Sequence, residues 1–253
     1  MVYRYTISTK HNLDRLSDMF YWPALDLFLW GLTGIYFAKI SGDFKGTTYV
    51  LLTGLVFWIV VWRAQYEINT NFLDELWDKN IVNLFASPLT IYEWILSVII
   101  FGFIKMIASL LFSALLAYMF FGYNILLFGT LIFPIVANLV LSGWAGGFFV
   151  GGFLTRFGVR IQTMAWAGVA LLAPFSALYF PISILPSWAQ QITHFVPPSY
   201  MFEGMRQYLT TGTFPINYFL IALALNLFYL VLSITFFVNM FNQSRKLGLG
   251  RLI

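Results

Sequence analysis

Six long apolar segments dominate the sequence, and they constrain the fold more than any other feature. A helix needs roughly 20 apolar residues to cross the ~30 Å hydrocarbon core of a bilayer. Backbone polar groups in lipid must be satisfied within the chain, so such segments form helices and not isolated strands. The segments are residues 22–40, 47–66, 92–120, 125–153, 162–180 and 218–240. We therefore predict an all-α membrane protein with six transmembrane helices in one domain, residues 1–253.

The charge content supports this class. Only 9% of the residues are charged, whereas a soluble domain carries about 25%. The net charge is +4, but the basic residues are scattered and form no cluster of the kind that binds nucleic acid. Cysteine is absent, which excludes disulfides and thiol chemistry.

The basic residues also predict an orientation. If the N-terminus is inside, ten of the 14 Lys and Arg residues fall in cytoplasmic segments. Three fall outside, and Lys105 lies within the third span. The positive-inside rule therefore predicts a multi-pass protein of the inner or plasma membrane with both termini in the cytoplasm.

The N-terminal segment and the fourth span each allow two interpretations. Leu13 and Phe20 belong to a stripe at helical spacing that follows Asn12 as a cap, which predicts an interfacial helix along the inner surface. The alternative is a disordered tail. In the fourth span, we expect a break or tilt at Pro134 and a ridge of glycines at four-residue spacing, Gly143, Gly147 and Gly151. The ridge serves close helix packing or belongs to a flexible gating helix.

Two segments between the spans are neither crossings nor simple loops. In the inner one, an amphipathic stripe predicts a short helix over residues 71–85, and Thr90 with Glu93 predicts a capping box that restarts the chain. This helix either lies on the membrane surface or docks a cytoplasmic partner. The outer segment, 181–215, has five prolines but many aromatic residues, which predicts a re-entrant pair of short helices over 187–209.

These two segments carry a resemblance to a known family. The runs W-D-K-N-I-V-N-L-F-A-S-P-L-T-I-Y-E and F-P-I-S-I-L-P-S-W-A-Q-Q-I-T-H-F-V-P-P-S-Y-M-F-E-G-M-R, together with the order of the spans, resemble the membrane-spanning permease subunit of type 2 ABC exporters. The resemblance implies that two copies form a channel and that each docks on a separate nucleotide-binding subunit. That subunit would hold ATP and Mg, and the chain itself has no phosphate loop of the G-x-x-x-x-G-K-[ST] type.

The resemblance also implies roles for particular residues. The outer helix pair would line or close the outer end of the pathway. The substrate would be an amphiphile (a lipid, a drug or a lipid-linked glycan) moved out of the cytoplasm, and this chain would bind no cofactor or metal and have no catalytic residue. The residues implied in docking are Asp74, Glu75, Trp77, Asp78, Asn80 and Asn83, and those implied in the outer gate are Trp188, His194, Tyr200, Glu203 and Arg206.

Charges near the membrane are open to more than one interpretation. Lys105 would cost about 2.5–3.5 kcal/mol at mid-bilayer, so it either meets a partner or an aqueous path, or it extends to the inner surface. Glu203 and Arg206, three residues apart, are suited to an ion pair that is structural or contacts substrate. Asp26 is expected to be positional.

Two other classes of function compete with an exporter subunit. A secondary transporter or channel would favour intramembrane carboxylates and internal repeats, and the sequence shows no repeat. An intramembrane enzyme would need clustered catalytic side chains, but the chain has only two histidines and no acidic cluster within a span.

Overall fold

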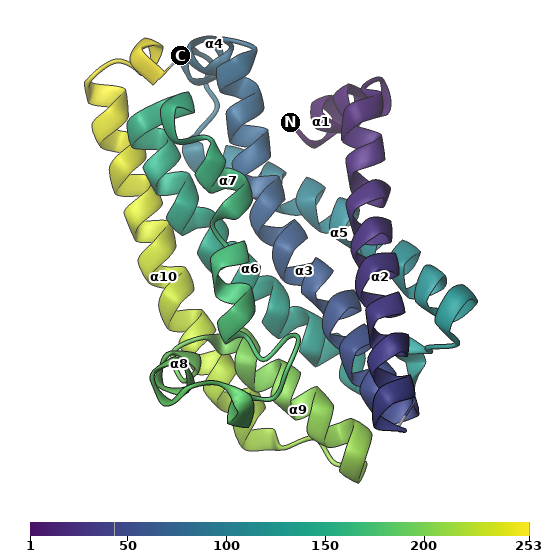
Figure 1. Ribbon diagram of the computed structural model, residues 1–253. Helices are drawn as coiled ribbons and strands as arrows, with labels where there is room; N and C mark the ends of the chain where they lie inside the picture. Colours follow the sequence, from purple (N-terminus) through teal and green to yellow (C-terminus); the bar gives the residue numbers. More distant parts are fainter. Residues whose placement is uncertain (43, 253) are drawn as a thin grey trace.

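The computed structural model describes residues 1–42 and 44–252, and within them it is built from helices with no strand. Both termini and α4 lie at one end of the bundle, which we call the terminal end, and α8 and α9 lie at the opposite end (Figure 1). The α-helices are α1 (Val2–Lys10), α2 (Leu13–Ser41), α3 (Phe44–Trp77), α4 (Ile81–Ala86), α5 (Ile91–Phe121), α6 (Ile132–Phe157), α7 (Thr163–Ala167), α8 (Ser187–Thr193), α9 (Pro197–Thr211) and α10 (Ile216–Lys246). Short 3-10 segments are η1 (Ile125–Leu131), η2 (Gly158–Ile161), η3 (Ala170–Phe175), η4 (Ile182–Ile184) and η5 (Leu249–Leu252).

Four helical stretches in the described residues are long and apolar enough to cross a membrane: Thr48–Trp77, Ile91–Phe121, Ile125–Ile161 and Ile216–Lys246. They correspond to the second, third, fourth and sixth predicted spans. The structure therefore confirms an all-helical chain with four helices that are compatible with a transmembrane protein. The number of six crossings stays a prediction.

The first and fifth predicted spans differ from these four. Helix α2 has 29 residues, enough for ~43 Å of helix, but Asp26 and Lys39 reduce its apolar character. The fifth span, predicted over 162–180, is not one helix, because α7 ends at Ala167 and η3 follows as a separate turn. Pro174 lies within η3, and proline cannot donate the backbone hydrogen bond that would continue an α-helix.

The N-terminal prediction was correct about the cap and wrong about the helix. Asn12 accepts hydrogen bonds from the backbone N–H groups of Asp14 and Arg15, at 3.0 and 3.3 Å. Residues from Leu13 onward do not form a separate interfacial helix, because they continue without a break into α2. The separate helix is α1, which lies before Asn12 and packs against α5.

The predicted helix over 71–85 is in fact two elements. Helix α3 continues to Trp77 and ends in a Schellman motif, in which the Asn80 N–H donates to the Glu75 carbonyl and the Lys79 N–H donates to that of Leu76. Lys79 occupies the left-handed position of this motif with φ of 54°. The chain then forms α4 and restarts at α5, where the predicted capping box of Thr90 and Glu93 is confirmed.

Lys79→Gly should stabilise the protein by about 1 kcal/mol, because glycine adopts the left-handed conformation without the steric cost of a Cβ. Lys79→Ala, which removes the charge but keeps the Cβ, is the matched control and should give no such gain. Thermal unfolding of the purified chain in detergent measures both. A gain in the alanine variant equal to that of glycine would show that the charge, and not the backbone, sets the effect.

The fourth predicted span is broken, but not at Pro134. Gly129 in η1 has non-helical backbone angles, φ 53° and ψ −130°. The α-helical part, α6, begins at Ile132. Pro134 lies in its first turn, where the backbone N–H groups have no partner within the helix. Proline is therefore tolerated at that place.

The glycine ridge of α6 packs against α3. A Cβ added at Gly143 would lie 2.5 Å from the Cβ of Ala64, and one at Gly147 would lie 2.9 Å from the Cδ1 of Ile68. At Gly151 it would lie 3.2 Å from the Oδ1 of Asn69. All three glycines thus allow the two backbones to approach closely, as the packing interpretation requires.

Candidate functional site

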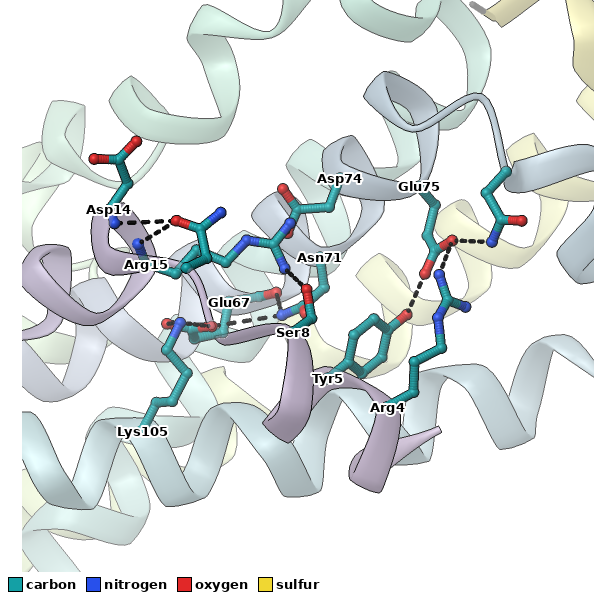
Figure 2. A network of polar contacts seen from close by, with 12 residues as sticks. Arg4, Tyr5, Ser8, Asp14, Arg15, Glu67, Asn71, Asp74, Glu75 and Lys105 are labelled. Carbon is teal, nitrogen blue, oxygen red and sulfur yellow. Dashed lines mark hydrogen bonds and ion pairs between the residues drawn. The ribbon is translucent and has the colours of Figure 1, made fainter. Parts of the chain in front are cut away.

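Toward the terminal end, charged side chains from α1, α2, α3 and α5 form neighbouring groups of ion pairs, and Figure 2 labels all of them except Asp18 and Arg63. Four basic residues and four acidic residues take part, so the cluster is neutral. We call it the ion-pair network, and it consists of Arg4, Arg15, Asp18, Arg63, Glu67, Asp74, Glu75 and Lys105.

Glu67 lies at the buried centre of the network. Its carboxylate is 2.7 Å from the Nζ of Lys105 and 3.4 Å from the Nη1 of Arg63. The Arg63 side chain is fully buried and also pairs with Asp18 at 2.7 Å. Lys105 is therefore one member of an internal pair, so the first of its predicted alternatives, a partner, is confirmed.

A second part of the network joins α2 to the last turn of α3. Arg15 lies 2.9 Å from the Oδ2 of Asp74 and donates to the Ser8 hydroxyl at 2.8 Å. Ser8 belongs to α1, so this arginine connects three helices, as Figure 2 shows.

Glu75 anchors α1. Its carboxylate accepts hydrogen bonds from Arg4 at 2.8 Å, from the Tyr5 hydroxyl at 3.1 Å and from Asn80 at 2.7 Å. Tyr5 in turn accepts a hydrogen bond from the indole N–H of Trp94 on α5 at 2.9 Å. Burial and the adjacent Glu75 carboxylate raise the pKa of the Tyr5 hydroxyl well above its usual range, so it stays protonated and donates.

The predicted docking residues fall into two groups. Asp74 and Glu75 are buried in the ion-pair network and face inward. Trp77, Asp78 and Asn83 are exposed. Asn80, which is partly buried, lies between the groups and is bound to Glu75.

Buried residues of α4 hold the exposed docking candidates in place. Helix α4 buries Ile81 and Leu84 in the apolar cluster at the terminal end and turns Val82 and Asn83 outward. On the neighbouring turn, the indole N–H of Trp77 donates to Gln162 at 3.2 Å. We call Trp77, Asp78, Lys79, Val82 and Asn83 the exposed turn.

The residues predicted for the outer gate lie on α8 and α9 and in the turn between them, at the end opposite the terminal end. Glu203 and Arg206 form the predicted ion pair, and Arg206 also donates to the Ala177 carbonyl at 2.8 Å. This second bond ties α9 to the turn after η3, which favours a structural role for the pair. Tyr200 donates to the His194 carbonyl at 3.1 Å, and Trp188 is exposed.

The sequence did not reveal the network, because its pairs join residues up to 71 positions apart. In the sequence, Arg4, Arg15 and Arg63 contribute to the count of basic residues that predicts the orientation, and Asp18 carries no prediction. One available signal was helical spacing, since Arg63 and Glu67 are four residues apart on an otherwise apolar helix.

Comparisons with known proteins do not assign the chain to a family. No protein-family model matches the sequence, and no relative is found among proteins of established function.

Proposed function

We propose that this chain is the transmembrane subunit of an ATP-driven exporter of the type 2 ABC class, with six spans and both termini in the cytoplasm. In this proposal, two copies form the pathway in an inner or plasma membrane. A separate nucleotide-binding subunit, which holds ATP and Mg, binds the exposed turn, and the chain itself catalyses no reaction. The cargo is an amphiphile that leaves the cytoplasm.

The observation that carries the proposal is that the exposed turn lies at the terminal end and is firmly attached to the core. It projects from the end of the bundle that holds both termini, and it is fixed to the core by the buried residues of α4 and by the Asn80–Glu75 hydrogen bond. A protruding element of this kind can pass a displacement of a bound partner to α3 and α5. Two apolar side chains of the exposed turn are available for such a partner, because Trp77 is 46% exposed and Val82 is 44% exposed.

The test is co-purification with an ATP-binding-cassette subunit that gains vanadate-sensitive ATPase activity. Val82→Lys should weaken that complex by about 2 kcal/mol, roughly 30-fold, because it places a charge at the centre of the apolar contact. Ile184→Lys makes the same change at an exposed apolar residue of the opposite end and should leave the complex intact.

Two results would contradict the proposal. One is an intact complex with Val82→Lys, which would move the docking site elsewhere. The other is ion-driven uptake into liposomes by this chain without any ATPase, which would favour a secondary transporter or channel.

A further inference from the structure

A pocket that contains no member of the ion-pair network in its lining lies between α2, α3 and the segment that contains η3. Its volume is about 260 Å³. One acid, Asp26, lines it, together with three indole rings and a phenol ring, and the rest of the lining is apolar. The rings belong to Trp22, Trp58, Trp62 and Tyr179.

Asp26 has no counter-ion among the residues that the structure describes. The carboxylates that take part in ion pairs there are Asp18, Glu67, Asp74, Glu75 and Glu203. Asp26 lies near the middle of α2, and no basic residue lines its pocket. In the proposed arrangement of six spans α2 crosses the bilayer, and an ionisable side chain within a span is expensive and points to a functional site.

The aromatic residues complement this negative charge. The faces of aromatic rings attract cations, most strongly in tryptophan, and cages of such rings recognise quaternary ammonium groups. The same attraction occurs at the edge of this pocket, where the guanidinium of Arg63 lies 5.0 Å from the centre of the Trp62 ring. That arginine is already neutralised by Asp18 and Glu67.

We propose that the pocket binds an organic cation, a quaternary ammonium or a protonated amine, with Asp26 as its counter-ion and the aromatic rings as its walls. An anion would meet an unpaired carboxylate, and a neutral group would leave it without a partner. The inference rests on the proposed function, because it makes the cation the charged part of the exported amphiphile. It thereby narrows the substrate class from any amphiphile to a cationic one.

The test is equilibrium binding of radiolabelled phenyltrimethylammonium to the full chain in an uncharged maltoside detergent. The parent protein should bind this probe saturably, and tert-butylbenzene, which has the same shape without the charge, should compete poorly. Asp26→Asn should weaken binding at least about tenfold, which corresponds to the loss of one charge interaction. Asp26→Glu should retain binding, and Trp58→Leu should weaken it.

Asp14→Asn is the matched control, since it makes the same change on the same helix at an exposed residue outside the pocket. It should bind as the parent does. The inference is overturned if the parent shows no saturable binding, if tert-butylbenzene competes equally well, or if Asp26→Asn binds as tightly as the parent.

Failure of this inference can be distinguished from failure of the proposed function. The binding experiment contains no ATPase subunit, so its result does not depend on that partner. A complex with an ATPase subunit but no cation binding would overturn the pocket alone. Cation binding without any ATPase partner would overturn the exporter function alone.

Discussion

Replacing Glu67 by glutamine should destabilise the protein by about 3–5 kcal/mol, because it removes one partner of a buried ion pair and leaves the other charged. Glutamine has nearly the same shape, so the effect reports the charge. Lys105 would lose its only carboxylate partner among the described ion pairs, and its side chain is 9% exposed. Thermal unfolding in detergent, with chemical denaturation at fixed temperature, measures the loss.

Two further variants test this explanation. Glu93→Gln is the matched control, since Glu93 is exposed and glutamine also completes a capping box. The double variant Glu67→Gln, Lys105→Met should recover part of the stability, because no unpaired lysine remains. A loss below about 1 kcal/mol in Glu67→Gln would mean that water reaches Lys105.

Glu75→Ala should release α1 from the bundle. The substitution removes the acceptor for Arg4, Tyr5 and Asn80 at once, and it leaves the buried Tyr5 hydroxyl without that acceptor. Removing such a partner costs about 1–3 kcal/mol per buried polar group and more for charged groups. The Asn80 anchor of the exposed turn would be lost as well, so docking of a partner should also weaken.

The release can be measured because the chain has no cysteine. Thr9→Cys places one thiol on the buried side of α1, at a residue that is 6% exposed. This thiol should react slowly with maleimide in the parent and quickly with Glu75→Ala. Asp78→Ala, an exposed neighbour, is the control and should leave the reaction slow. Equal rates in all three proteins would show that α1 is held by its apolar contacts alone.

Asp74 and Glu75 are buried, unlike Asp78 and the other exposed members of the predicted docking set. Asp74 and Glu75 were expected to contact an ATPase subunit directly, and their positions in a charged, amphipathic stretch gave no reason to separate them from Asp78. The structure places both in buried ion pairs with Arg15 and Arg4. Substitutions of Asp74 and Glu75 should therefore act indirectly, through stability and, for Glu75, through the Asn80 anchor, so the proposed docking is tested directly only at the exposed turn.

Features with local causes were predictable. The capping box of Thr90 and Glu93, the cap at Asn12 and the two short helices α8 and α9 follow from side chains within a few residues of one another. Features that depend on distant contacts were not. Helix α3 extends past residue 66 although its later turns are polar, because Arg63, Glu67 and Asp74 find partners on other helices.

The pocket around Asp26 illustrates the same limit. The sequence shows Asp26 near an end of the first predicted span, where a charge is unremarkable. The structure begins the helix at Leu13, which places Asp26 near its middle. Only the fold brings it beside Trp58 and Trp62, which are more than 30 positions away in the sequence.

The glycine ridge limits how the protein can move. A Cβ added at Gly143 would lie 2.5 Å from the Val61 carbonyl oxygen, and one added at Gly147 would lie 3.2 Å from the Cα of Gln65, so a slide of α6 along α3 would bring larger side chains against the α3 backbone. These two helices should therefore behave as one rigid body. A rearrangement of the bundle should therefore occur along other contacts, such as those between α2 and α3, where the ion pairs Arg15–Asp74 and Asp18–Arg63 lie toward the terminal end.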